Sequence, residues 1–398
     1  MEKLFEKFYQ KLHHVSLQFI RSEYNKIHWN ARLIGIKGAR GVGKTTLILQ
    51  HIKKTHTLNE QVLYISLDDI WFSGHSLVEL ADIFVKRGGK YLYLDEVHKY
   101  KNWSVEIKNI YDDHPELHII FTGSSLLEIL NSRADLSRRA VVFSLQGLSF
   151  REYLAFTQNL SIKPITLDDI IHHHITISNE ILKKIKPLRY FSHYLKNGYY
   201  PFFKEEEELY HIRIEEILNM ILQIELPLTR GTDIAYIHKL KKLLLIIAES
   251  APFIPNISKL SERIGINRNT LIVYLTHLKD AGVIHMLYKD ASGITRLQKP
   301  DKIFIENTNL SWAIHPSHPN VGNLRETFFV NQLNKNHLVT IPQHADFLIN
   351  NNYIFEIGGK NKSKTQINTY KKKAFIALDD IEYGSENKIP LWMFGFLY

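Results

Sequence analysis

The segment from Gly38 to Thr45 constrains the fold of this chain more than any other stretch. It reads Gly38-Ala39-Arg40-Gly41-Val42-Gly43-Lys44-Thr45, so that four residues separate the first glycine from Gly43-Lys44-Thr45. An apolar run, Leu33-Ile34-Gly35-Ile36, precedes the segment, and Thr46-Leu47-Ile48-Leu49 follows it with a helical pattern. A strand, a glycine-rich loop and a helix in this order are typical of a phosphate-binding loop. The alternative, a chance glycine-rich turn, does not explain the flanking patterns.

The residue types in this loop suit a phosphate chain. Glycines lack a β-carbon and tolerate positive φ, so successive backbone N–H groups from Gly41 to Thr45 are expected to face one anion at a helix N-terminus. Lys44 is expected to reach the β and γ phosphates, and the Thr45 hydroxyl to ligate Mg2+. The residues predicted to contact nucleotide are Gly38, Ala39, Arg40, Gly41, Val42, Gly43, Lys44, Thr45 and Thr46.

Composition narrows the class of protein. At 398 residues the chain exceeds one ordinary core, so roughly two to four domains are expected. A hydrophobic fraction of 44% with 12 prolines indicates a folded globular protein. Cysteine is absent, which excludes disulfides and thiolate metal sites and favours the reducing cytoplasm. The amphipathic start, Met1–Lys7, and the lack of a long apolar run argue against a signal peptide and a membrane span.

Two carboxylates follow a buried strand. The apolar run Tyr91–Leu94 ends in Asp95-Glu96. Asp95 is predicted to hold Mg2+ through water, beside Thr45, and Glu96 is predicted to polarise the attacking water as the catalytic base. A plain strand that ends in a solvated turn would look the same without the upstream loop. With the loop, the pair indicates ATP hydrolysis.

Further strand patterns alternate with helical ones, which predicts a parallel α/β sheet flanked by helices. The predicted strands are 33–36, 62–67, 91–94, 117–121 and 140–145, and a helix is predicted over 76–86. After the fourth strand come small hydroxyl residues, of which Ser124 is favoured to contact the γ phosphate. Capping of the next helix by Ser124 or Ser125 is an equally good interpretation.

The chain at this point resembles the AAA+ group of ATPases, in particular the bacterial and archaeal predicted ATPases that combine an AAA domain, a winged helix and a C-terminal domain of uncharacterised function. The resemblance is carried by the phosphate loop, by Leu94–His98, Trp103 and Phe121–Ser125, and by Gln146–Tyr153. It implies ATP and Mg2+ as cofactors, and no guanine-reading Asn-Lys-x-Asp motif is present. It also implies an arginine finger acting in a neighbouring subunit, for which Arg138 and Arg139 are the candidates, with Arg133 behind them. Surface solvation of these arginines is the alternative, because the finger requires a homo-oligomer.

A second strong pattern lies between Ile237 and Tyr288. Residues 257–264 and 267–278 are predicted as two short helices separated by a turn at Gly265, and 283–288 and 303–305 as a β wing. This is a winged helix-turn-helix pattern, with Arg268, Asn269, Tyr274, His277 and Lys279 expected on the exposed face of the second helix. Double-stranded DNA is one expected partner, and the net charge of +9 agrees with it. Docking to another protein explains the same pattern equally well.

The C-terminal part carries a third set of acids. Glu326 lies on a predicted helix, 322–333, and Asp346 and Glu356 lie on two predicted strands joined at Asn350–Asn352. They are predicted to converge on a divalent metal, in an arrangement similar to the restriction-endonuclease-like superfamily, whose signature is Asp, then Glu or Asp, any residue, and Lys. The sequence departs from it at Gly358, and Lys360 is the proposed replacement for the lysine. Phosphate contact by a cluster of lysines is expected, and a solvated tail is an equally good interpretation; the cluster is Lys360, Lys362, Lys364, Lys371, Lys372 and Lys373.

Together these patterns predict four parts: a P-loop ATPase domain over 1–155, a helical lid or linker over 156–235, a winged helix over 236–310 and a small α/β endonuclease-like domain over 311–398. The leading hypothesis is a Mg2+-dependent ATPase that acts as a switch or motor, with DNA as its candidate partner. An ATP-gated nuclease and a nucleotide-sensing scaffold without a DNA partner are the two rivals.

Overall fold

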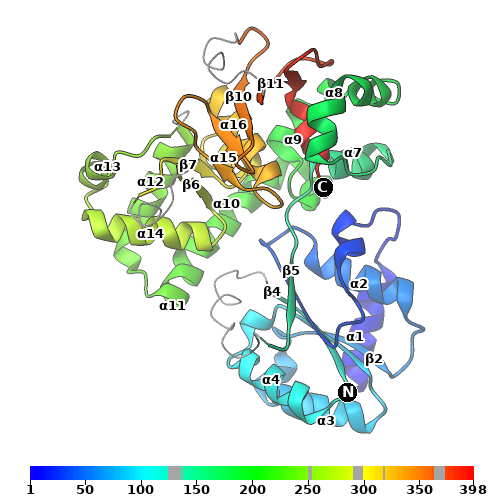
Figure 1. The fold of residues 1–398 in the computed structure, drawn as a ribbon. Coiled ribbons are helices and arrows are strands. Elements are labelled where there is room, and N and C mark those ends of the chain that lie inside the picture. The colour runs from blue at the N-terminus through cyan, green and yellow to red at the C-terminus, as the bar shows by residue number, and fades with distance from the viewer. Residues whose placement is uncertain (124–135, 137, 250–252, 290–298, 317–318, 363–372) are drawn as a thin grey trace. The chain divides into compact units, whose positions relative to one another are not determined.

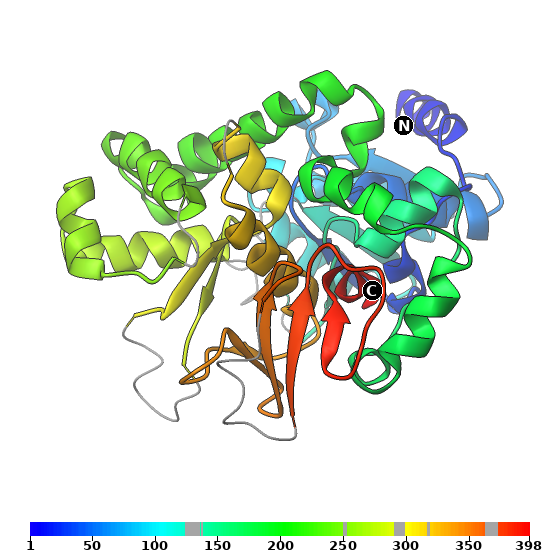
Figure 2. The same cartoon turned by 90° about the horizontal axis from the view of Figure 1, so that it is seen from above.

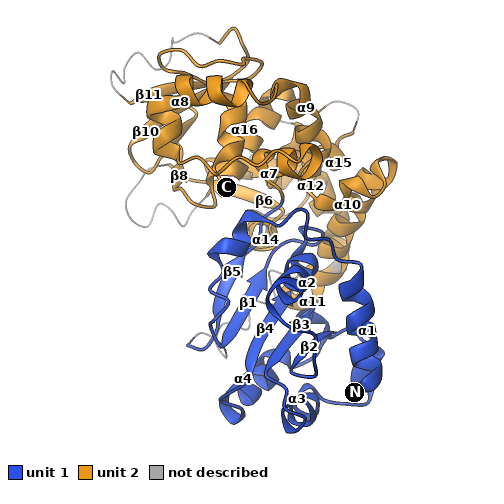
Figure 3. Ribbon diagram, turned by 90° about the vertical axis from the view of Figure 1, so that its right-hand side faces the viewer, with its two compact units in different colours: residues 1–147 blue, residues 148–398 orange. Residues whose placement is uncertain are grey.

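The computed structural model describes residues 1–123, 136, 138–249, 253–289, 299–316, 319–362 and 373–398 (Figure 1). The chain divides into two compact units, Met1–Gly147 and Leu148–Tyr398 (Figure 3). The division between the units falls close to the predicted end of the ATPase domain, while the division of the remainder into three parts stays a prediction. In the described part of the chain, no helix has both the length and the apolar character needed to cross a membrane.

Unit 1 is built on a five-stranded sheet in the order β2-β3-β4-β1-β5, in which all the neighbouring strands are parallel. The strands are β1 Leu33–Lys37, β2 Val62–Ser66, β3 Tyr91–Asp95, β4 His118–Gly123 and β5 Val141–Ser144. The central strands are buried along almost their whole length, as expected when helices cover both faces of a parallel sheet. The predicted parallel α/β sheet is confirmed.

Helices cover both faces of this sheet. They are α1 Glu2–His13, α2 Lys44–Thr55, α3 Leu77–Lys86 and α4 Trp103–Asp113. Leu80, Phe84 and Ile107 of α3 and α4 share one apolar cluster with Leu92 and Leu94 of β3. Tyr93, between those two leucines, faces the other side, where its ring lies 6.1 Å from that of His51 on α2. This period of two along β3 places α2 on the opposite face from α3 and α4.

Local signals explain where the helices of unit 1 begin. Helix α3 starts after Ser76, whose side chain accepts a hydrogen bond from the Glu79 N–H. Helix α1 buries Leu4, Phe8 and Leu12, which are spaced four residues apart and so share one face. Because the first turn of α2 follows Gly43 directly, the free N–H groups of that turn lie beside the glycine-rich loop.

Unit 2 contains helices and two small sheets, with the larger sheet coloured from orange to red in Figure 2. Its order is β12-β11-β10-β9-β8, parallel between β10, β11 and β12 and antiparallel elsewhere. The strands are β8 Val339–Thr340, β9 Phe347–Ile349, β10 Tyr353–Gly358, β11 Ala374–Leu378 and β12 Lys388–Pro390. The helices are α7 Phe150–Gln158, α8 Leu167–Leu182, α9 Leu188–Asn197, α10 Tyr210–Met220, α11 Leu226–Arg230, α12 Ile237–Glu249, α15 Thr308–Ile314 and α16 Val321–Leu333.

Two helices and a strand pair occupy the region of the predicted winged helix. Helix α13, Ile257–Ile264, ends at Gly265 with φ +71°, and α14, Arg268–Asp280, begins after Asn267, whose side chain accepts from the Thr270 N–H. Strands β6, Ile284–Leu287, and β7, Lys302–Ile305, pair antiparallel. One expectation about α14 is wrong: Tyr274 is 8% exposed, because its ring packs against Tyr236.

The two ends of unit 2 are joined by buried hydrogen bonds. Ser149 caps α7, and its hydroxyl also donates to the backbone oxygen of Tyr398 at 2.6 Å. Arg151 Nε donates to the same oxygen at 2.9 Å. Both side chains are buried, so these bonds stabilise the contact between α7 and the last residues of the described chain.

Candidate functional site

The loop between β1 and α2 has the backbone conformation that the glycines predict. Gly41 and Gly43 adopt φ values of +78° and +94°, in the region that favours glycine. A β-carbon on Gly38 would lie 2.2 Å from the carbonyl oxygen of Leu145, so only glycine fits this close approach to the chain after β5. The residues of the loop therefore fit a phosphate-binding hollow at the start of α2.

The Lys44 side chain lies inside this loop. It is 5% exposed, and its Nζ donates to the carbonyl oxygens of Gly38 and Ala39, both at 2.9 Å. The ammonium group is thus held over the loop, at the place where a lysine of this motif meets phosphate. Thr46, one residue beyond Thr45, is exposed at the start of α2.

Arg21, outside every predicted motif, connects this loop to the rest of unit 1. Its side chain is 4% exposed and donates from Nη1 to the Val42 carbonyl oxygen at 2.8 Å. Its Nη2 donates at 2.8 Å to the carbonyl oxygens of Gln146 and Gly147. No sequence motif marks this arginine. Its partners are backbone carbonyl oxygens, one in the loop and two that lie more than a hundred residues away along the chain.

Asp95 and Thr45, predicted to share a metal, lie side by side. The Thr45 hydroxyl donates to Asp95 Oδ2 at 2.6 Å, and the Tyr64 hydroxyl donates to the same oxygen at 2.7 Å. Thr122 donates from its hydroxyl to Asp95 Oδ1, and the Glu96 N–H lies 3.1 Å from that oxygen. Asp95 is only 2% exposed, so these donors offset the cost of burying its charge. A hydroxyl oxygen beside a carboxylate is a ligand pair that fits Mg2+.

Tyr64 keeps its proton in this position. Burial, and after it the negative charge of Asp95, raises the pKa of the Tyr64 hydroxyl far above its usual value. The hydroxyl therefore remains a hydrogen-bond donor to Asp95 throughout the physiological pH range.

Glu96, the predicted catalytic base, has an unusual backbone. Its φ of +52° is in the left-handed region, which is uncommon for a residue with a β-carbon and is concentrated at functional sites. Its Oε2 lies 3.4 Å from His98 Nε2, which lies 3.2 Å from Arg40 Nη2 in the glycine-rich loop. Burial, followed by the charge of Arg40, lowers the pKa of His98 to about 3. His98 is therefore neutral at pH 7, so its Nε2 either accepts from Arg40 or donates to Glu96, but not both.

Of the other residues predicted to act in unit 1, some lie within the described part of the chain and some lie outside it. Ser124 and Arg133 lie outside the described residues, whereas Thr122 supplies a hydroxyl to Asp95 at the end of β4. Arg139 makes a bidentate pair with Asp112, with Nε and Nη2 each 2.9 Å from a carboxylate oxygen. Arg138 is exposed just before β5. Of the two candidate arginine fingers, Arg139 is thus engaged within its own unit.

The three acids of the C-terminal part, which were predicted to converge on a metal, lie beside two lysines. Lys302 Nζ lies 3.2 Å from Glu326 Oε2 and 3.6 Å from Asp346 Oδ1. Lys362 Nζ lies 3.0 Å from Asp346 Oδ2 and 3.7 Å from Glu356 Oε2. The predicted metal site of Glu326, Asp346 and Glu356 is therefore not formed: across the residues described, no three metal-ligating side chains are grouped to hold an ion. Two ammonium groups lie among the three carboxylates instead.

Lys362, and not Lys360, is the lysine that reaches these acids. A β-carbon on Gly358 would lie 2.3 Å from Lys362 Cδ, so the Lys362 side chain crosses the space that glycine leaves. Lys360 is exposed, and Lys364, Lys371 and Lys372 lie outside the described residues. Burial raises the pKa of Glu356, although the charge of Lys362 opposes this.

The stability of unit 1 is expected to depend on His51, which lies on α2 behind the glycine-rich loop. Burial, followed by the charges of His56 and Lys54, lowers the pKa of His51 from 6.5 to about 3. Below pH 6.5 the unfolded chain therefore binds a proton at this residue that the folded chain does not, and stability falls as pH falls. The expected loss is about 1.4 kcal/mol per pH unit between about pH 6 and 4.

Urea denaturation at a series of pH values measures this contribution. His51→Gln retains an acceptor for the Tyr24 hydroxyl, which lies 3.2 Å from His51 Nδ1, and its free energy of unfolding should decline less steeply on acidification. His13→Gln, at an exposed histidine, is the control. Equal slopes for wild type and His51→Gln would contradict the prediction.

Comparison with known proteins agrees with this geometry. A family model described as an AAA domain matches residues 30–154, and one described as a Sulfolobus plasmid regulatory protein matches residues 237–299. The uncharacterized protein MJ1637 of Methanocaldococcus jannaschii is 28% identical over 284 residues, which are 68% of this chain and 60% of that protein. The chain thus spans less than two thirds of this relative's length.

Solved structures were also compared with this chain. The Walker-type ATPase PABY2304 of Pyrococcus abyssi is 14% identical at a TM-score of 0.42, covering 74% of this chain and 95% of that one. The Aeropyrum pernix ORC1 protein in complex with DNA is 13% identical at a TM-score of 0.30, covering 78% and 92%. The whole chains superpose poorly at these scores. The matched residues 30–154 contain both the glycine-rich loop and Asp95 in one parallel sheet, so this part of the chain has the P-loop fold of the AAA domain whose family model it matches.

Proposed function

We propose that this chain binds ATP together with Mg2+ at the loop Gly38–Thr46 and hydrolyses it to ADP and phosphate. The observation that carries the proposal is the 2.6 Å hydrogen bond between Thr45 and Asp95 beside the buried Lys44. It supports a shared place for the metal, since both side chains offer oxygen atoms and lie next to the phosphate-binding residue.

Each residue has a distinct role in this reaction. The backbone N–H groups of the loop and Lys44 bind the phosphates, and Thr45 and Asp95 would hold Mg2+. When bound, Mg2+ supplies positive charge that neutralises the β and γ oxygens as the phosphoryl bond breaks. Glu96 accepts a proton from the attacking water and orients it toward the γ phosphate. Glu96 lies beside His98, which in turn lies beside Arg40 of the loop.

The first test compares nucleotide binding with hydrolysis. A fluorescent ADP analogue should bind wild-type protein in EDTA and more tightly with Mg2+, and phosphate release from ATP should require Mg2+. Tight binding without any phosphate release would support the rival, a nucleotide-sensing scaffold. Absence of binding under both conditions would end the proposal.

We further propose that helices α13 and α14 bind double-stranded DNA. The match of residues 237–299 to a plasmid regulatory family supports this, as do the two capped helices joined at Gly265. Arg268 and Asn269 are exposed at the start of α14, and Lys279 is exposed near its end. Side chains at the first turn of such a helix can contact base edges and phosphates.

Salt dependence tests this second proposal. The logarithm of the binding constant for duplex DNA should fall linearly with the logarithm of salt concentration, with a slope of about −0.9 for each phosphate contacted. Arg268→Ala should make the slope shallower by about 0.9, the contribution of one phosphate contact. Lys184→Ala, at an exposed lysine after α8, should leave the slope unchanged. A salt-independent interaction, or no interaction, would favour docking of this region to a protein.

A further inference from the structure

Tyr64 lies in unit 1 and belongs to none of the predicted motifs. Its hydroxyl nevertheless donates a hydrogen bond to Asp95, at the proposed metal site. We infer that Tyr64 is a positioning residue that holds the Asp95 carboxylate in the orientation needed for Mg2+, and so sets how strongly Mg2+ tightens nucleotide binding. This inference rests on the proposed function, because it concerns the metal that accompanies ATP.

The parallel register of β2 and β3 brings Tyr64 to Asp95. Ser66 pairs with Asp95, and Tyr64 pairs with Tyr93. Side chains two residues apart on a strand lie on one face, so Tyr64 is a diagonal neighbour of Asp95 on the face that also carries α2. An aromatic side chain is long enough to span this diagonal, and the hydroxyl oxygen lies 2.7 Å from Asp95 Oδ2. The contact therefore follows from strand register and not from proximity in sequence.

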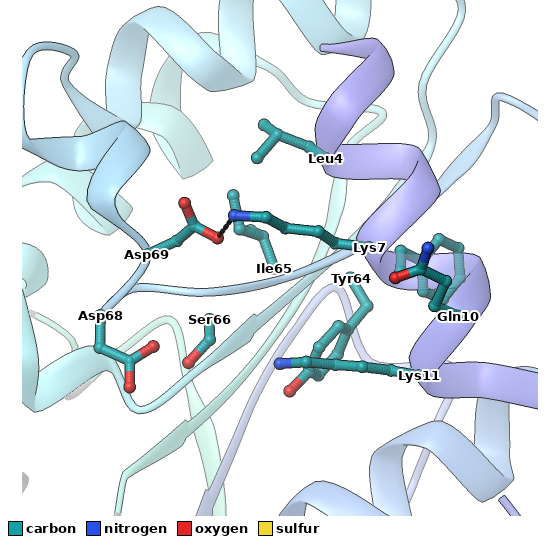
Figure 4. Close-up of a pocket in the computed structure, with 10 residues that line it drawn as sticks. Leu4, Lys7, Gln10, Lys11, Tyr64, Ile65, Ser66, Asp68 and Asp69 are labelled. Carbon is teal, nitrogen blue, oxygen red and sulfur yellow. Dashed lines mark hydrogen bonds and ion pairs between the residues drawn. The ribbon is translucent and has the colours of Figure 1, made fainter. Parts of the chain in front are cut away.

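The ring of Tyr64 is held from its other side by α1. The Phe8 ring lies 6.2 Å from the Tyr64 ring, and Lys11 Nζ lies 5.2 Å from its centroid. Figure 4 shows the Lys11 side chain alongside the ring, at a pocket of about 170 Å3 between α1 and the end of β2. Tyr64 is 3% exposed. Packing against α1 thus fixes the ring, and the fixed ring fixes the hydroxyl.

The hydroxyl completes the set of donors around a buried charge. Asp95 Oδ2 accepts from Tyr64 and Thr45, while Oδ1 accepts from Thr122. Thr45 is itself a proposed Mg2+ ligand. If Thr45 were the only donor to Oδ2, this oxygen of Asp95 would shift whenever Thr45 shifted. Tyr64 is a donor to Oδ2 that does not belong to the phosphate-binding loop. Hydrogen-bond partners of this kind orient metal-binding carboxylates, and their removal commonly costs about 10-fold in metal affinity or more.

The test measures binding instead of turnover. The affinity for a fluorescent ADP analogue is measured in EDTA and across a Mg2+ titration, for wild type and for Tyr64→Phe. The Tyr64→Phe protein should bind the analogue in EDTA as wild type does, which also shows that the loop is folded. The Mg2+ concentration that gives half of the tightening should rise about 10-fold.

Tyr93→Phe is the matched control. Tyr93 lies opposite Tyr64 on the adjacent strand and is fully buried, but its hydroxyl bonds His56 Nε2 at 2.8 Å and not Asp95. Its Mg2+ titration should match wild type. If Tyr64→Phe has the wild-type Mg2+ requirement, or loses affinity equally in EDTA, the inference is wrong while the proposed function stands. If wild-type protein shows no effect of Mg2+ on nucleotide binding, the proposed function fails first.

Discussion

Lys44→Ala is expected to lower the rate of ATP hydrolysis by about 100-fold or more, the effect seen when a preorganised group that stabilises transition-state charge is removed. Lys44 is 5% exposed, and its ammonium lies over the loop, where it donates to the carbonyl oxygens of Gly38 and Ala39. In a reaction that places negative charge on the β and γ oxygens, no other side chain among the described residues of this loop supplies a buried ammonium. Initial rates of phosphate release at saturating ATP and Mg2+ measure the loss.

Nucleotide affinity separates the two effects of this substitution. Weaker binding of a fluorescent ADP analogue would measure the contact that Lys44 makes in the ground state. The remaining loss of rate would measure the contact that it makes only in the transition state. Lys54→Ala is the control, because Lys54 lies on the same helix but its ammonium lies over the Tyr24 ring, 4.8 Å from the centroid. Unchanged hydrolysis by Lys44→Ala would remove the basis for the whole assignment.

Glu96→Gln is expected to reduce hydrolysis by about 100-fold while leaving nucleotide affinity close to that of wild type. The change removes a group able to accept a proton, and general-base catalysis is worth about 100-fold or more. Glutamine has nearly the same shape, so the left-handed backbone at this position and the contact with His98 can persist. The Glu96→Gln protein is expected to bind ATP and retain it. Single-turnover measurements would detect the bound ATP as unhydrolysed.

The control for this substitution is Glu116→Gln, at an exposed carboxylate between α4 and β4. It should hydrolyse ATP at the wild-type rate. Hydrolysis by Glu96→Gln at the wild-type rate would exclude Glu96 as the base. A matching loss of affinity and rate would instead indicate that Glu96 maintains the loop through His98 and Arg40.

Much of unit 1 could be predicted from sequence because its signals are local. The glycine spacing of the loop, the apolar runs of the strands and the Ser76 cap each act over a few residues, and all appear in the structure. The placement of Thr45 beside Asp95 was also predictable, since parallel strands deliver their carboxyl ends to one edge of the sheet. Tyr274 could not be assigned correctly, because its burial depends on Tyr236 from another element.

The C-terminal acids show the opposite case. Sequence patterns predicted that Glu326, Asp346 and Glu356 converge on a metal, but they did not reveal which cations would lie beside these acids. Lys302 comes from β7, and Lys362 reaches back across Gly358. Two lysines lie among these acids where a metal was expected, and no three metal-ligating side chains are grouped in the described part of the chain.

By itself, the sequence determined that this chain carries a phosphate-binding loop followed by a strand that ends in two carboxylates, because both depend on short-range spacing. Only the tertiary structure decided which side chains hold those groups in place. Arg21 reaches the loop from the N-terminal segment, and Tyr64 reaches Asp95 across two paired strands. Neither contact leaves a trace in local sequence, because strand register and packing against α1 bring these residues together only after the sheet has formed.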